Sequence, residues 1–135
     1  MRPLEHVPAV RRIETDRPKL FAIEVTGEFN SADAENLCGL LEGAYALHDR
    51  IDLLIRIEGL ESVNLADVAR DTVRSMRDHL ARHVDRCAII EDGGWSPEIE
   101  RLLKPDDGAE TRRFAPNEEP QAWLWLEARE TAPDT

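Results

Sequence analysis

The stretch IDLLIRIE, residues 51–58, decides how this chain folds. Its apolar side chains Ile51, Leu53, Ile55 and Ile57 alternate with a mostly polar set. A period of two residues is typical of a β-strand, because successive side chains point to opposite faces of a sheet. The sequence therefore predicts a strand with one buried face and one face that is at least partly wet, and we expect Gly59 to end it.

An amphipathic helix is predicted on each side of this strand. Each helix is preceded by Asn-x-x-Asp, first at residues 30–33 and again at residues 64–67, a spacing that resembles a capping box. Apolar residues then recur every three or four positions, which gathers them on one helix face. We expect the first helix to run to about Leu47 and the second to cover residues 64–82.

Further strands are predicted before the first helix and after the second. Residues 10–13 and 20–25 are short apolar stretches separated by a turn-rich segment with a proline, so they indicate a β-hairpin, and we expect Gly27 to end its second strand. The continuous apolar run Cys87–Ile90 is typical of a strand that is buried on both faces.

The last third of the chain adds three short elements. Ser96 followed by Pro97 is typical of a helix start, and that helix should end at about Leu103. Glu110–Phe114 is a predicted final strand, and Asn117 is expected to cap the last helix. The predicted order is β-β-α-β-α-β-α-β-α, which favours an α/β fold with helices against a mixed, mostly parallel sheet of about five strands.

The length and composition indicate one soluble domain spanning residues 1–135, with residues 130–135 as a frayed tail. No apolar run approaches the roughly 20 residues that span a bilayer. The N-terminus lacks the continuous apolar segment of a secretory signal, so we expect a cytoplasmic protein. Cys38 and Cys87 are then expected to be free thiols.

The charge of the chain argues against two classes of partner. The 28 acidic and 17 basic residues give a net charge of −11. Binding to phosphate backbones needs clustered Lys and Arg, and anionic lipid surfaces repel an acidic protein. We therefore expect no nucleic-acid partner and no membrane insertion.

A more specific pattern occurs in the C-terminal half. Ala88-Ile89-Ile90-Glu91-Asp92-x-x-Trp95 is followed by Arg113-Phe114 and then by Ala122-x-x-Trp125-Leu126. Together with the order of elements, this pattern resembles the SpoIIAA-like family, whose fold is of the STAS type. The resemblance implies a STAS-like domain, also compared with lipid-binding CRAL-TRIO folds, that acts by binding rather than by catalysis and uses no cofactor.

One departure from the STAS pattern weakens the hypothesis that the protein is regulated by phosphorylation. STAS antagonists of anti-sigma factors carry an Asp-Ser-Ser/Thr-Gly turn at the start of the second helix, where a kinase modifies a serine. This chain has Glu61-Ser62-Val63-Asn64-Leu65 instead. Ser62 is the nearest hydroxyl, but the second hydroxyl and the glycine are missing. A phospho-regulated protein-interaction switch at Ser62 is therefore an alternative, and a plain loop serine is favoured.

The candidate ligand-binding residues follow from position along the chain. Glu91 and Asp92 come just after a predicted strand, where open α/β sheets usually bind their ligands, although acidic residues also commonly open a Gly-Gly turn. Trp95 lies in the same loop, and Ser62 and Asn64 lie at the start of the second helix. The leading hypothesis is a noncatalytic module that binds a small apolar ligand or a protein partner there.

No catalytic set is evident in the sequence. There is no Gly-x-Ser-x-Gly elbow, and neither cysteine has a catalytic context. His79 and His83 are four residues apart but lack a third ligand, and histidines also suit a helix C-terminus. We expect no metal and no enzyme activity. A small hydrolase that uses Glu91, Asp92 or the histidine pair is the alternative.

Self-association is a further expectation. The half-polar strand at residues 51–58 and an exposed hairpin edge are surfaces that a second copy of the chain would cover. The sequence therefore predicts a homodimer.

Overall fold

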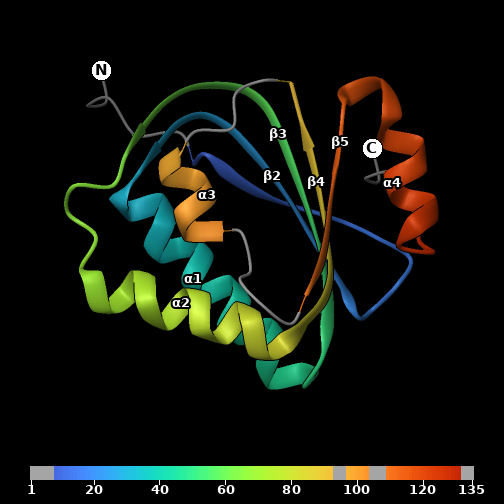
Figure 1. Cartoon of the computed structure of the whole chain (residues 1–135), viewed down its shortest axis with the longest axis horizontal. Helices are drawn as coiled ribbons and strands as arrows, with labels where there is room; N and C mark the ends of the chain where they lie inside the picture. The colour runs from blue at the N-terminus through green and yellow to red at the C-terminus, as the bar shows by residue number, and fades with distance from the viewer. Residues whose placement is uncertain (1–7, 93–96, 104–108, 132–135) are drawn as a thin grey trace, which may run out of the picture.

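The computed structural model describes residues 8–92, 97–103 and 109–131 (Figure 1). The strands are β1 (Val10–Ile13), β2 (Leu20–Asn30), β3 (Ile51–Asn64), β4 (Val84–Glu91) and β5 (Glu110–Phe114). The helices are α1 (Ser31–Leu47), α2 (Arg70–His83), α3 (Pro97–Leu103) and α4 (Glu119–Trp125), with a 3-10 turn, η1 (Pro116–Glu118), before α4. The predicted order of elements is confirmed, although Ser96, the predicted cap of α3, lies outside the described residues.

The five strands form one mixed sheet in the order β1-β2-β3-β4-β5. β1 pairs antiparallel with β2, as the predicted hairpin requires, and the other neighbours are parallel. A helix connects each parallel pair, which lets consecutive strands lie side by side. β3, which contains residues 51–58, is the central strand.

Helices cover both faces of the sheet (Figure 1). α1, α2 and α3 pack on one face against a core that includes Leu53, Ile55 and Ile57 of β3. α4 packs on the other face against Leu54 and its neighbours. The alternation along β3 therefore sorts its side chains between two cores. None of the helices in the described ranges is both long and apolar enough to cross a membrane.

Two strands continue past the glycines that we expected to end them. β2 runs through Gly27 to Asn30, and β3 runs through Gly59 to Asn64, with Asn30 still paired to Asn64. Both glycines have a left-handed φ, 67° at Gly27 and 65° at Gly59. Glycine adopts this conformation without steric cost, so each strand accommodates an irregularity and the pairing resumes beyond it.

Only the first Asn-x-x-Asp motif is a capping box. Oδ1 of Asn30 accepts a hydrogen bond from the Asp33 N–H at 3.1 Å, and the Asp33 carboxylate accepts one from the Asn30 N–H at 3.0 Å. In the second motif Asn64 belongs to β3, and its Oδ1 accepts from the Ala66 N–H at 3.1 Å. The predicted start at residue 64 is wrong, because this local turn replaces the helix and α2 begins at Arg70.

The polar face of β3 is wet only toward its end, where Glu58 is exposed, because α4 packs against the part at Leu54. Asp52 is buried, and its carboxylate accepts hydrogen bonds from Arg17 at 2.5 Å and Arg86 at 2.8 Å. Arg56 is half-buried and pairs with Glu119 of α4 at 2.7 Å. These polar groups have protein partners, so the half-polar strand no longer supports self-association. The homodimer itself stays a prediction.

The C-terminal segment also differs from expectation. Asn117 lies inside η1, and the residue that precedes α4 is Glu118, so the predicted cap at Asn117 is wrong. We expected fraying from residue 130, but Glu130 forms an antiparallel bridge with Thr15 and the Thr131 N–H donates to the Glu14 carbonyl at 2.9 Å. Residues 132–135 lie outside the described residues.

Candidate functional site

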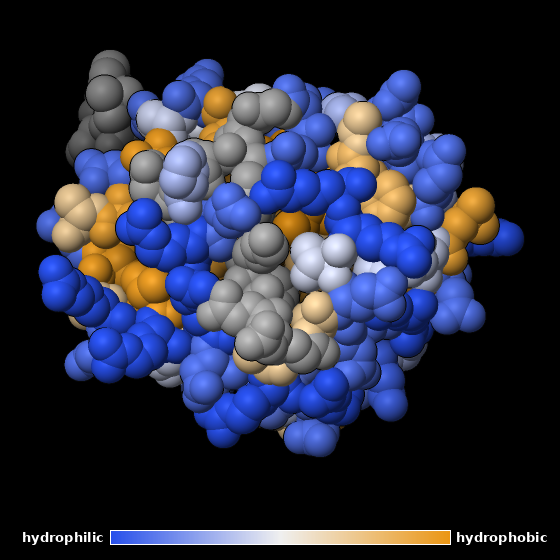
Figure 2. All heavy atoms as spheres, in the orientation of Figure 1, coloured by the Kyte–Doolittle hydropathy of each residue, from blue (hydrophilic) through white to orange (hydrophobic). Residues whose placement is uncertain are grey.

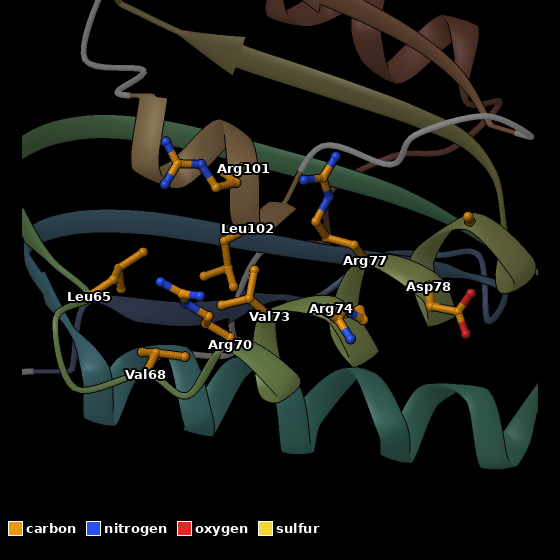
Figure 3. A pocket seen from close by; sticks show the side chains of 10 residues that line it. Leu65, Val68, Arg70, Val73, Arg74, Arg77, Asp78, Arg101 and Leu102 are labelled. Atoms are coloured by element: carbon orange, nitrogen blue, oxygen red, sulfur yellow. The ribbon is translucent and has the colours of Figure 1, made fainter.

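A cavity of about 770 Å³ lies between α2 and α3, on the side of the sheet that carries three helices (Figure 3). This volume is in the range of small-molecule sites, roughly 300–1,000 Å³. Its lining combines aliphatic and basic side chains from α2, α3 and the segment before α2. The lining residues are Leu65, Val68, Arg70, Val73, Arg74, Arg77, Asp78, Ala81, Arg101 and Leu102.

One face of α2 forms the longest wall of this cavity. Arg70, Arg74, Arg77 and Ala81 follow one another at three- and four-residue intervals, which places them along one side of a helix. Met76 and Leu80 point into the core instead and are buried. The amphipathic pattern of α2 therefore fixes the helix to the sheet and leaves an arginine-rich face toward the cavity.

The aliphatic part of the lining comes from three separate segments. Val73 belongs to α2 and Leu102 to α3, whereas Leu65 and Val68 lie in the segment between β3 and α2. The Val68 N–H donates to the Leu65 carbonyl at 3.1 Å, so this segment is turned. A helix that started at residue 64 would have carried these two side chains on α2, so the late start of the helix creates this wall. In the space-filling view an apolar patch lies at the left of the face, bordered by hydrophilic side chains (Figure 2).

The charged part of the lining is strongly basic. Four arginines, Arg70, Arg74, Arg77 and Arg101, face one acidic residue, Asp78. The Asp78 carboxylate accepts a hydrogen bond from Arg82, outside the lining, at 2.7 Å. Arg70, Arg74 and Arg101 are exposed and have no ion pair with any residue in the described ranges. The cavity is therefore a local positive site on a protein whose net charge is −11.

The predicted ligand-binding residues lie apart from this lining. Glu91 ends β4, and its Oε2 atom is buried without a hydrogen-bond partner in the described part of the chain, while Asp92 is exposed beside it. Ser62 and Asn64 are exposed at the end of β3. None of these four lines the cavity, and Trp95 lies outside the described residues. Ligand binding by these residues, and modification of Ser62, stay predictions.

Among the described residues, the predicted location and the cavity meet only at the end of β3. Asn64 immediately precedes Leu65, the first residue of the lining. The loop after β4 was favoured because ligand sites in α/β sheets commonly lie beyond strand ends. The cavity instead lies between α2 and α3, and a rule that predicts ligand sites beyond strand ends does not predict a site between two helices.

The two histidines contact α1 and the loop that follows it. His79 Nδ1 lies 2.5 Å from Oε1 of Glu42, and His83 Nδ1 lies 2.7 Å from the Asp49 carbonyl oxygen. The His83 ring stacks on Tyr45, with ring centroids 4.4 Å apart. Within the described ranges no group of three or more His, Cys, Asp or Glu side chains is arranged to hold a metal ion.

Sequence reasoning missed the arginines of the cavity. Arg70, Arg74 and Arg77 recur at the spacing of one helix face, so this signal was available in the sequence. Arg101 follows 24 positions after Arg77, and no periodicity relates the two. Only the packing of α3 beside α2 brings Arg101 to the same cavity.

Comparisons with known proteins agree with this fold. A crystal structure of an uncharacterized protein from the DUF3478 family with a SpoIIAA-like fold, from Shewanella loihica PV-4, is 22% identical to the chain. The match covers 90% of this chain and 98% of that one, with a TM-score of 0.58. No curated protein matches the chain.

The family comparison agrees with the expected resemblance. The family model described as SpoIIAA-like matches residues 20–127, from β2 to the end of α4. The SpoIIAA-like fold supports a regulatory or interaction module in general and assigns no ligand. Since the family model matches well over half of this chain, the chain belongs to the SpoIIAA-like family.

Proposed function

We propose that this protein is a noncatalytic binding module whose small-molecule ligand occupies the cavity between α2 and α3. The observation that carries the proposal is the cavity itself, about 770 Å³ in volume with an aliphatic wall. The sequence favoured a small apolar ligand near Glu91–Trp95. The proposal keeps a ligand with an apolar body but assigns its binding site to the cavity between α2 and α3.

The aliphatic side chains supply the driving force for binding. Leu65, Val68, Val73 and Leu102 come from three segments and meet at one cavity. Removing apolar surface from water stabilises a complex by about 25 cal/mol per Å². A ligand with an apolar body therefore gains free energy by displacing water from this wall.

The lining supports binding over catalysis. Among the described residues that line the cavity, Asp78 is the one carboxylate, and it is paired with Arg82. The other lining residues are arginines, which stay protonated, and aliphatic residues. Acid–base or nucleophilic catalysis needs a group of suitable pKa that faces the substrate.

A neutral fluorescent probe tests the proposal. N-phenyl-1-naphthylamine is titrated into the full chain, and we expect saturable binding to one site. Val73→Trp and, separately, Val68→Trp fill the cavity from two segments and should weaken the binding by about tenfold or more. Leu124→Trp is the matched control, because Leu124 is 76% exposed on α4, on the opposite side of the sheet.

Two results would overturn the proposal. One is the absence of saturable binding of this probe and also of decanoate, decyl phosphate, decanol and decyltrimethylammonium. The other is binding that neither filling variant weakens, with each variant shown to be folded by its thermal unfolding transition. The Ser62 switch and the small hydrolase stay predictions beside this proposal.

A further inference from the structure

We infer that the ligand of this cavity is an amphiphilic anion, a carboxylate or a phosphate monoester on an aliphatic chain. Its anionic group is held by Arg70, Arg74 and Arg101, and its chain lies on the aliphatic wall at Leu65, Val68 and Val73. This inference rests on the proposed function, because it names the ligand class of the same cavity.

The first argument is the accumulation of like charge. Arg70 and Arg74 are four residues apart on one helix, and like charges at this spacing destabilise a helix. Arg101 adds a third guanidinium from α3. The acid in the lining, Asp78, is already paired with Arg82. An anion in the cavity would give these three guanidinium groups, which have no ion pair within the described residues, a partner of opposite charge.

The second argument is that the basic groups come from two walls. Arg70 and Arg74 belong to α2, and Arg101 belongs to α3. In the close view, Arg101 extends from α3 and Arg70 from α2, with Leu102 between them and Val73 beside Arg70 (Figure 3). Guanidinium groups bind carboxylates and phosphates through paired N–H donors. The cavity therefore has guanidinium groups on two of its walls.

The start of α2 adds backbone N–H donors to the part of the cavity that Arg70 lines. The N-cap residue is Ala69, whose methyl side chain cannot accept a hydrogen bond from the first turn. The first backbone N–H groups of a helix lack partners within the helix, and the helix dipole favours negative charge there. Arg70 is the first residue of α2 and lines the cavity, so this positive end adds to the arginines.

The apolar wall determines the rest of the ligand. Among the described residues, the lining has four larger aliphatic side chains and no aromatic ring. Proteins commonly hold nucleic-acid bases by stacking them on aromatic side chains, which the described part of the lining does not offer. An aliphatic chain needs only apolar contact, and the partly exposed Leu65, Val68 and Val73 provide it. The combination therefore favours an aliphatic anion over a nucleotide.

Isothermal titration of the full chain with matched ten-carbon amphiphiles tests the inference. Decanoate, decyl phosphate, decanol and decyltrimethylammonium are compared below their micelle concentrations. We expect at least one of the two anions to bind about tenfold or more tightly than decanol, and the cation to bind more weakly than decanol. The two anions separate a carboxylate from a phosphate headgroup. Added salt should weaken only the binding of the anion.

Arginine variants assign the headgroup to its site. Arg70→Gln combined with Arg74→Gln, and Arg101→Gln alone, should each weaken anion binding by a larger factor than decanol binding. Arg11→Gln is the control, because the Arg11 side chain is 73% exposed and pairs with Glu24 of β2, away from the cavity.

The outcomes separate this inference from the proposed function. If decanol binds as tightly as both anions, or if the arginine variants leave anion binding unchanged, the inference is wrong and the binding module stands. If neither the neutral probe nor any amphiphile binds, both fail. Tighter binding of an acidic peptide than of either anion would also overturn the inference, since the partner would then be a protein.

Discussion

Arg86 of β4 donates a hydrogen bond to the buried carboxylate of Asp52 in β3, with Nη2 2.8 Å from Oδ2. Arg17 donates to the same oxygen at 2.5 Å. The two arginines also reach the end of α4, because Arg17 donates to the Leu126 carbonyl and Arg86 to the Trp125 carbonyl. Asp52 is therefore the centre of a polar cluster that joins α4 to the sheet.

Asp52→Asn is expected to destabilise the protein by about 2 kcal/mol. Loss of the carboxylate charge leaves two arginine side chains, 24% and 30% exposed, without their counterion. Breaking a fully buried pair costs about 3–5 kcal/mol, and this partial exposure lowers the cost. Urea unfolding at neutral pH measures the effect. Asp85→Asn is the matched control and should cost less, because Asp85 and its partner Arg50 are both about half exposed. An equal loss in the two variants would contradict the prediction.

The stability that Asp52 contributes should disappear in acid. Burial alone would raise the pKa of the Asp52 carboxyl, but the hydrogen bonds and charges of Arg86 and Arg17 outweigh it and hold the pKa below its ordinary value. A carboxyl with a lowered pKa in the folded state adds stability above its unfolded pKa of about 3.9, and this is lost as the pH falls through the folded value.

The measurement is urea unfolding of the natural sequence and of Asp52→Asn across acidic pH. We expect the difference in their free energies of unfolding to be constant above about pH 5 and to shrink below about pH 4. A difference that grows as the pH falls would contradict the sign of the pKa shift.

Asn30→Ala and Asn64→Ala should have different effects although both residues begin an Asn-x-x-Asp motif. Asn30→Ala removes a helix cap and should cost about 1 kcal/mol. Asn64→Ala removes one hydrogen bond, to the Ala66 N–H, in an exposed turn and should cost less. Chemical denaturation of the two variants measures this contrast. A loss at Asn64 as large as that at Asn30 would indicate that the second motif also caps a helix.

The two cysteines should differ in their reactivity toward a thiol reagent. Burial raises the pKa of Cys87 to about 12, and the residue is fully buried. Burial and then the nearby Glu42 carboxylate raise the pKa of Cys38, which is partly exposed. Since the thiolate is the reactive form, Cys38 should react slowly and Cys87 only on unfolding. Mass spectrometry of alkylated native protein measures both rates, and denatured protein is the control. Equal native rates would contradict the prediction.

Much of the fold was predictable from local sequence. The alternation at residues 51–58 reports which side chains share a face of the sheet, and the Asn30 capping box uses atoms only three residues apart. The predicted bounds of Glu110–Phe114 are confirmed for β5. These features depend on neighbours in the chain, so their pattern carries the structural information.

The strand ends and the polar cluster could not be predicted in the same way. β3 passes Gly59 because β2 continues to pair with it, and a glycine by itself does not reveal that partner. Arg56 of β3 is half-buried because Glu119 on α4 comes to lie beside it. Both outcomes depend on residues that are distant in sequence.

The candidate site shows the same division. The sequence by itself determined that Arg70 and Arg74 share a helix face, since that follows from the helical period. Only the tertiary structure decided that Arg101 and Leu65 join them around one cavity. The physical reason is that periodicity specifies directions within one element, whereas a cavity depends on how separate elements pack their buried faces together.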